Sequence, residues 1–451
     1  MTTPTAENAI YEYTKQVALE AYIYGYAPVT QFNLMSHDLT NRAPMNQMFY
    51  MTGASTPSDQ IFSGPNADTI YATAWLDLTN TPVFIDTPDT KNQNLWFTIQ
   101  LLDMYTNTIT NIPGISKQRK PQKFLVIGPN VTTNDVKVNP NIARDVRVVY
   151  SPTNLVYLVS RTSIPNHDVD TAVSISQQIK IRPMYRNSVV LEIEPFSTDI
   201  FTTNLFYSAL LSLMKYNPPP VGNSPLVNLF KTIGLDPDVE FNAASLPENV
   251  QQALTDAALI GFEQIIPFGY LYGTAIVSSN FWLGGTDMGI WRNDYLRRDF
   301  VAYGGSAGNV SIEQDYLTCV QDSIGTLVNG AEHNYKMHFN ADLSNYPETV
   351  NGFWSITLYI NSTLIPGFNL QLYDNEINRY SLATNNNDLI YNGDMSMDIF
   401  IQHDAPTNPD EYANWLPCPA GPFRLIFRIY SATVDQVYTP NIPALVINDT
   451  L

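Results

Sequence analysis

Residues 64–78 read GPNADTIYATAWLDL, and this stretch decides the fold of the first half of the chain. It opens on a turn, because Asn and Asp side chains bond to nearby backbone amides, and it continues into β-branched and aromatic residues over positions 70–76. Further short β-rich runs, separated by Pro, Asn and Asp, follow at 82–85, 95–101, 123–127, 146–150 and 156–161. This spacing predicts an antiparallel β-sandwich.

Helical patterns flank the predicted sandwich on both sides. They cover residues 7–26, 169–179 and 198–215. In the first pattern, apolar residues recur at spacings of three and four, and Gly25 and Pro28 are expected to end the helix. Ser245 and Glu248 match a capping box, which predicts a helix that runs to about residue 265.

A second set of β-rich runs begins beyond Gly330. The runs are 335–339, 354–360, 388–391, 397–402 and 423–429. Just before them, Ser311 and Gln314 repeat the capping pattern and predict a helix over 315–324. We therefore expect an α+β, mainly β fold with two sandwiches. Its expected parts are a helical segment (1–65), the first β-sandwich (66–165), a second helical segment (166–330) and the second β-sandwich (331–451).

Several motifs in this order resemble a bacterial family that pairs the domains of unknown function 1254 and 1214 (DUF1254 and DUF1214). In the first half they are residues 64–78 (RPNxDTLYSxAWLDL in the family), 100–107 (QxxDxxTN) and 151–162 (SPT…RT). In the second half they are residues 353–359 (FWSxTLYD), 378–382 (NRYSLG) and 414–423 (NWLPAPxGxF). The resemblance implies an immunoglobulin-like sandwich, a helical insert and a jelly-roll-like sandwich at the C-terminal end.

The chain departs from the family pattern at a few positions. Gly64 stands where the family usually has Arg, and Cys418 where it often has Ala. The family's DGS element is here GDMS, residues 393–396. An anion site that used the family Arg would lack that residue here.

Composition argues against several classes of protein. Lys and Arg number 23 against 42 Asp and Glu, and the net charge of −19 disfavours binding to nucleic acid or to an anionic membrane surface. No apolar stretch is long enough to predict a membrane span. Cys319 and Cys418 match no metal-ligand spacing, and no nucleotide-binding glycine motif occurs, so we expect neither metal nor cofactor. The N-terminus shows no signal-peptide pattern, which leaves the compartment open, with an extracellular or particle-surface location among the options.

Two carboxylates in the family-like segments are candidates for general acid and base chemistry. Asp68 and Asp103 both sit in strings rich in Asn and Thr. Carboxylates on neighbouring strands can divide acid and base roles when their environments separate their pKa values. We favour the alternative that both side chains cap backbone amides at turns.

A further set of side chains is a candidate for ligand binding. The set is Asn66, Tyr71, Trp75, Gln100, Asn107, Arg161, Arg379 and Trp415. Basic residues are scarce, so Arg161, Arg379, Arg424 and Arg428 attract attention. We favour a structural clasp in which Asp68 or Asp103 pairs with such an Arg, and the alternative is an anion-binding pocket.

Three hypotheses for function remain open. The first is a non-catalytic binding or structural protein that takes part in surface assembly, with a virion or other coat as one setting. The second is an enzyme acting on a small or carbohydrate-like substrate through Asp68 or Asp103. The third is a carrier of an apolar ligand, suggested by the 12% aromatic content. The expected partners are a glycan or small molecule and a second copy of the chain, since most oligomers are symmetric homo-oligomers.

Overall fold

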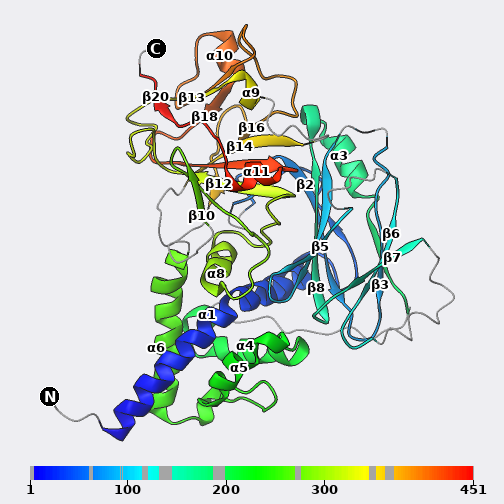
Figure 1. Cartoon of the computed structure of the whole chain (residues 1–451), viewed down its shortest axis with the longest axis vertical. Coiled ribbons are helices and arrows are strands. Elements are labelled where there is room, and N and C mark those ends of the chain that lie inside the picture. The colour runs from blue at the N-terminus through cyan, green and yellow to red at the C-terminus, as the bar shows by residue number, and fades with distance from the viewer. Residues whose placement is uncertain are drawn as a thin grey trace.

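The computed structural model describes residues 5–59, 64–91, 93, 95–113, 120–131, 145–185, 199–269, 276–344, 352–360 and 370–449. The fold is mixed α+β, as predicted, but not mainly β: within the described residues a substantial helical part accompanies four mainly antiparallel sheets. In Figure 1 the helices α1, α4, α5 and α6 lie at one end, and the two sheet-containing parts lie side by side at the other.

The first pair of sheets is built from the family-like N-terminal motifs. One sheet has the order β1 (Phe49–Tyr50), β2 (Thr69–Asp77), β8 (Leu155–Ser163), β4 (Phe97–Asp103) and β5 (Thr108–Ile112). The other has the order β7 (Val146–Tyr150), β6 (Lys123–Ile127), β3 (Val83–Asp86) and β9 (Lys180–Pro183). Leu76, Ile85 and Leu101 belong to the buried core between them. Each of the six predicted β-rich runs overlaps a strand, because short apolar and β-branched runs bounded by Pro, Asn and Asp are a local signal for strands.

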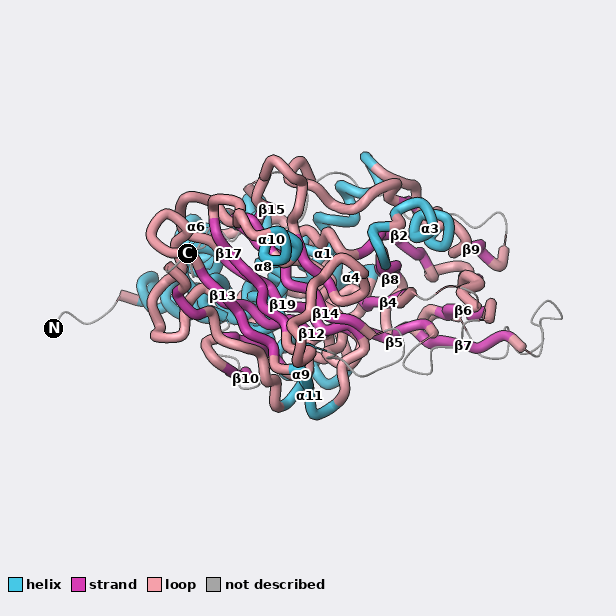
Figure 2. Tube along the Cα trace, turned by 90° about the horizontal axis from the view of Figure 1, so that it is seen from above, coloured by secondary structure: helices cyan, strands magenta, loops and turns pink. Residues whose placement is uncertain are grey.

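The second pair of sheets forms the C-terminal part. One sheet has the order β10 (Ile276–Ser279), β11 (Trp282–Gly285), β12 (Gln314–Cys319), β19 (Arg424–Tyr430), β14 (Phe353–Ile360) and β15 (Gln371–Leu372), with β16 (Ser381–Ala383) also paired to β14. The other has the order β18 (Trp415–Pro417), β17 (Met397–Gln402), β13 (Tyr335–Phe339) and β20 (Val446–Ile447). Figure 2 shows β13, β17, β19 and β14 running alongside one another. In their shared core, the Trp354 ring stacks on Phe339 with centroids 4.7 Å apart.

Two predictions about the C-terminal half are wrong. Residues 314–319 form strand β12, where a helix was expected over 315–324, because Leu317 and Cys319 alternate into the core while the strand pairs with β19. Residues 388–391 form no strand. Cys319 and Cys418 are both free thiols buried in this core, and burial raises the pKa of each to about 12.

The helical part begins with α1 (Ala6–Asn41), which is much longer than predicted because it passes through Gly25 and Pro28. Its partners are α4 (Leu205–Tyr216), α5 (Ser224–Lys231), α6 (Glu248–Ile260, continued by a π-helical turn over Gly261–Ile265) and α8 (Tyr295–Gly304). The predicted extent of α6 to residue 265 is confirmed, but its capping box is not. Pro247 occupies the N-cap position, and the Ser245 hydroxyl donates to the carbonyl of Asn242. Shorter helices are α3 (Val169–Ser176), α9 (Ala341–Ser344), α10 (Pro409–Ala413) and α11 (Val434–Tyr438).

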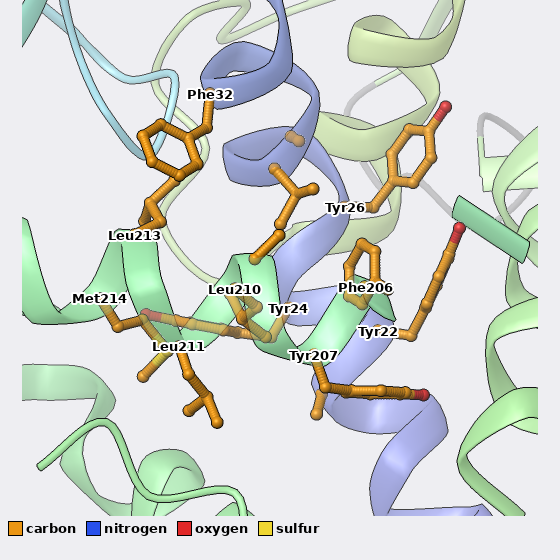
Figure 3. Close-up of a cluster of buried hydrophobic side chains, with 14 of the residues drawn as sticks. Tyr22, Tyr24, Tyr26, Phe32, Phe206, Tyr207, Leu210, Leu211, Leu213 and Met214 are labelled. Carbon is orange, nitrogen blue, oxygen red and sulfur yellow. The ribbon is translucent and has the colours of Figure 1, made fainter. Parts of the chain in front are cut away.

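Helices α1 and α4 pack against each other, and their buried side chains share a core with Trp75, Tyr157 and Val159 of the β2–β8 sheet. Figure 3 shows aromatic and aliphatic side chains of α4 packed against α1, and the rings of Tyr22 and Phe206 have centroids 4.1 Å apart. At the crossing, a Cβ on Gly25 would stand 2.7 Å from a methyl carbon of Leu210, so any side chain at this position would require Leu210 to move. This residue therefore serves the helix crossing rather than a helix end.

Pro28 is tolerated inside α1 because α8 supplies the missing hydrogen bond. A proline has no N–H, so the carbonyl four residues earlier, that of Tyr24, loses its helical donor. The guanidinium of Arg298 donates to this carbonyl. The neighbouring Asp299 carboxylate accepts from the backbone N–H of Ala27 at 3.1 Å. Two adjacent side chains of α8 thus join the middle of α1 to the wall of the site described next.

Candidate functional site

The start of the first family-like motif docks onto the C-terminal sheet. Asp68 accepts hydrogen bonds from the hydroxyls of Ser355 and Ser381, both at 2.5 Å, and its own N–H donates to the side chain of Asn66 at 2.8 Å. The Asn66 amide in turn donates to the Tyr430 hydroxyl at 2.9 Å. Asn66 and Asp68 therefore form a turn, as favoured from sequence, and they also link the two β-rich parts. We call this link, between Asp68 and the two serines, the clasp; it is not the Asp–Arg pair expected from sequence.

A cavity of about 250 Å³ lies beside this clasp, between the two β-rich parts and α8. Tyr71 and Arg161 are direct cross-strand neighbours on β2 and β8, so they project from the same face of that sheet. On the facing sheet, Arg424, Ile426 and Arg428 reach the cavity because alternate residues of a strand share a face. The rest of the wall includes Phe281, Leu283, Met288, Arg297, Phe300, Val301, Tyr316, Thr318 and Leu370.

Arg161 is 3% exposed and is held by neutral groups. Its Nη1 donates to Gln100 Oε1 at 2.8 Å and its Nη2 donates to the carbonyl of Ala307 at 2.7 Å. The guanidinium also lies 5.5 Å from the centroid of the Tyr71 ring. Gln100 is itself fixed by the hydroxyl of Thr108 at 2.8 Å. The partners of Arg161 are thus an amide and a carbonyl, where the clasp hypothesis expected a carboxylate.

Arg428 has a similar setting on the opposite sheet. It donates to the Thr357 hydroxyl at 2.8 Å and to the Tyr359 hydroxyl at 2.6 Å. Burial lowers the pKa of Arg428, but Tyr359, Tyr430 and Asp68 raise it more, so its charge is retained. The Tyr359 hydroxyl donates to the carbonyl of Pro65 at 2.7 Å and ties this site to the clasp.

A smaller cavity of about 100 Å³ adjoins the first. The two cavities share Gly64, Tyr71, Arg161, Ser306 and Ala307 in their walls. Arg161 and Tyr71 therefore stand at the boundary between two chambers. The position at which the family usually carries Arg is also at this boundary, where Gly64 has a φ of 69°.

Asp103 is placed by the β4–β5 turn and does not line either cavity. Its Oδ1 accepts from the N–H groups of Tyr105 at 2.9 Å and Asn107 at 2.8 Å, as the turn hypothesis predicted. Burial raises the pKa of Asp103 to about 6, and the bonds from Asn107 and Tyr105 limit that rise. The side chain of Asn107 also accepts from the backbone N–H of Trp291 at 3.4 Å, so this turn supports the loop before α8.

The other candidate residues lie apart from the cavity. Trp75 stacks on Tyr157 at a centroid distance of 4.1 Å and donates to Asp38 at 3.0 Å. Trp415 donates to the Gln402 carbonyl at 2.8 Å. Arg379 donates to the carbonyls of Tyr412 at 2.8 Å and Trp415 at 2.9 Å. Their hydrogen bonds and stacking give all three residues a structural role.

Sequence reasoning missed the contributions of β12 and α8. Tyr316 was not recognised because residues 315–324 were predicted to be helical. The available signal was that Leu317 and Cys319 lie two residues apart, as on one face of a strand, which places Tyr316 on the other face. Phe300 and Val301 carried no signal, because only the docking of α8 brings them to the cavity.

No group of three or more His, Cys, Asp and Glu side chains arranged to hold a metal ion occurs within the described ranges. In the same part of the chain, no helix combines the length and apolar character needed to cross a membrane.

Comparisons with known proteins agree with the motifs. Residues 45–183 match the family described as "Protein of unknown function (DUF1254)", and residues 313–434 match "Protein of unknown function (DUF1214)". The chain belongs to the family that pairs these two domains. The first matched region includes β2, β4 and β8, and the second includes β12, β14 and β19, so the cavity lies between the DUF1254 and DUF1214 regions.

Two solved structures resemble the DUF1254/DUF1214 protein. The VPA0106 protein from Vibrio parahaemolyticus has a TM-score of 0.69 and 21% identity, with 96% of this chain and 100% of that chain covered. An uncharacterised protein from Burkholderia cenocepacia has a TM-score of 0.47 and 11% identity, over 98% of this chain and 96% of that one. The first similarity shows a shared fold. The comparison with curated proteins gave no match.

Proposed function

We propose that this DUF1254/DUF1214 protein is a non-catalytic binding protein that holds a small, mainly apolar molecule in the cavity between its two domains. An immunoglobulin-like first sandwich and a jelly-roll-like second sandwich would supply the two walls, as the family resemblance implies. The observation that carries the proposal is the cavity itself, about 250 Å³ in volume and lined by side chains such as Phe281, Phe300 and Leu370. Ligand sites are typically concave, mainly apolar and supplied with a few fixed polar groups.

The same geometry favours binding over the enzyme hypothesis. The candidate acid and base, Asp68 and Asp103, are both engaged in several hydrogen bonds, and neither belongs to the cavity wall. Among the described residues of that wall, the titratable side chains are Arg and Tyr. Burial raises the pKa of Tyr316, which keeps its hydroxyl protonated as a hydrogen-bond donor. Such groups are suited to fixing a ligand in place.

The test is native mass spectrometry of the protein purified from its own source, compared with a variant whose cavity is filled. Val301→Trp places a large ring into the wall, and Val239→Trp is the control because Val239 is 63% exposed and lies outside the cavity. We expect one bound small molecule on the wild type and the control but not on Val301→Trp. Equal melting temperatures would show that both variants are folded. A wild type without ligand, or retention by a folded Val301→Trp, would contradict the proposal.

A further inference from the structure

We propose that the ligand of this cavity is a monoanionic amphiphile, a carboxylate with an apolar chain and about ten non-hydrogen atoms in all, with its head group held between Arg161 and Arg428. The inference rests on the proposed binding function and specifies its ligand class. It comes from the charge, geometry and size of the site.

The charge of the cavity wall is opposite to that of the protein. The chain carries a net charge of −19, yet the described wall contains Arg161, Arg297, Arg424 and Arg428 and no Asp or Glu. Arg297 has a carboxylate partner, since its Nε lies 3.2 Å from Asp294. Arg161 and Arg428 are each 3% exposed, and their hydrogen bonds within the described chain go to neutral oxygens.

A guanidinium is rarely buried in this way without a nearby anion, and while Asp68 acts on Arg428, the described partners of Arg161 are all neutral. Lys and Arg are seldom fully buried unless paired. Removing a charged group from water costs several kcal/mol, even after the surrounding protein has relaxed. The Nε atoms of Arg161 and Arg428 are also buried and lack a hydrogen-bond partner among the described residues. A bound carboxylate would supply the opposite charge and would match the planar donor set of a guanidinium.

Two tyrosine hydroxyls complete the proposed head-group site. Tyr71 lies beside Arg161, and Tyr316 is the cross-strand partner of Arg428 on β12 and β19. Burial raises the pKa of Tyr316 while the nearby Arg161 and Arg428 oppose that rise, so Tyr316 lies within the electrostatic reach of both. Cations and hydroxyls from both domains thus line the main chamber, and Arg161 and Tyr71 stand at its boundary with the smaller one.

The site favours one negative charge over two. Burial lowers the pKa of Arg428, whereas Tyr359, Tyr430 and the carboxylate of Asp68 raise it, so Arg428 already interacts with one carboxylate of the protein. The remaining wall is rich in apolar side chains, including Leu283, Met288 and Val301. A second negative charge on the ligand would cost several kcal/mol to remove from water. Arg428 would offset little of this cost, because it already interacts with Asp68.

The volume sets the size of the whole ligand. A dry cavity of roughly 150 Å³ accommodates benzene, which has six non-hydrogen atoms. The main chamber, at about 250 Å³, therefore accommodates about ten. Octanoate has this size, and its chain would extend from Arg161 toward Phe281, Phe300 and Leu370.

The test is isothermal titration calorimetry of the full chain with octanoate, 1-octanol and octyl phosphate. On wild-type protein we expect octanoate to bind at least tenfold more tightly than 1-octanol and more tightly than octyl phosphate. Arg161→Met should weaken octanoate at least tenfold and leave 1-octanol within twofold. Arg182→Met is the matched control, because it removes one positive charge from an exposed side chain on β9. It should change neither affinity.

The outcomes separate this inference from the proposed function. Equal binding of octanoate and 1-octanol would overturn the carboxylate assignment while leaving a small-molecule cavity in place. Tighter binding of octyl phosphate would overturn the monoanion assignment. Should Arg161→Met fail to fold, Tyr316→Phe replaces it, with octanoate expected to weaken at least threefold and 1-octanol to be unchanged. No binding of any probe, together with a ligand-free native mass spectrum, would contradict both proposals.

Discussion

Replacing Arg298 with Met should destabilise the protein, and replacing Pro28 with Ala should repair part of the damage. Arg298 is 3% exposed, donates to the Tyr24 carbonyl and lies 3.5 Å from Asp299 through its Nε. Its loss leaves a buried carbonyl without a donor and a buried carboxyl without a cation. Removing one partner of a buried ion pair costs about 3–5 kcal/mol, but burial raises the pKa of Asp299 well above its usual value and favours the neutral carboxyl, so we expect a loss of about 3 kcal/mol for Arg298→Met.

The repair follows from what Pro28 lacks. Alanine at position 28 restores an N–H that reaches the Tyr24 carbonyl as in an ordinary helix. An unsatisfied buried carbonyl costs about 1–3 kcal/mol, so the double variant should recover about 1–2 kcal/mol relative to Arg298→Met alone. The rest of the loss should persist, because alanine does nothing for Asp299. Pro28→Ala alone should be within about 1 kcal/mol of wild type, since Arg298 already satisfies the carbonyl.

The assay is equilibrium urea unfolding of the four proteins, followed by tryptophan fluorescence and by circular dichroism to check that the two signals coincide. Arg182→Met controls for the loss of one positive charge at an exposed site. Strict additivity of the two single changes would refute the reasoning, because it would mean that Arg298 and Pro28 do not act on the same carbonyl. Since Phe300 and Val301 of the same helix line the cavity, ligand affinity should fall with Arg298→Met and recover in part in the double variant.

Two further predictions concern buried carboxyl groups. Asp68→Asn should lower the free energy of unfolding by about 2–4 kcal/mol, because Ser355 and Ser381 donate to different carboxylate oxygens, the NH2 group that replaces one of them cannot accept, and hydrogen bonds to a charged group contribute about 1.5–3 kcal/mol each. The matched change at an exposed site, Asp388→Asn, should have little effect on the free energy of unfolding. An unchanged urea midpoint for Asp68→Asn would contradict the stabilising role of the Asp68 hydrogen bonds. Burial raises the pKa of Asp315 from 3.8 to about 8, so its protonated form is favoured in the folded state. Its contribution to stability is full below about pH 4 and is lost as pH rises through about 8, so Asp315→Asn should reduce the fall in melting temperature between pH 5 and 9. Identical pH profiles for the two proteins would show that Asp315 does not titrate in this way.

The sequence by itself determined the elements whose signal is local. The run 70–76 is rich in β-branched and aromatic residues and the run 424–428 shows polar and apolar alternation, and the structure makes them β2 and β19. The turn roles of Asp68 and Asp103 were also predictable, because an Asx side chain bonds to backbone amides only a few residues away. The family motifs located both domains for the same reason, since each motif is continuous in the chain.

Tertiary structure decided what depends on partners distant in sequence. Helix α1 continues through Pro28 because Arg298, 274 residues from Tyr24, donates to the freed carbonyl. Residues 314–319 form a strand because β19 pairs with them, and that pairing overrides a local capping pattern. The cavity arises where the outer faces of β2–β8 and β12–β19 meet beside α8, which brings Arg161 and Arg428 to one site. Periodicity tells which face of a strand a side chain occupies, but only the docking of the two sheets determines which side chains face each other.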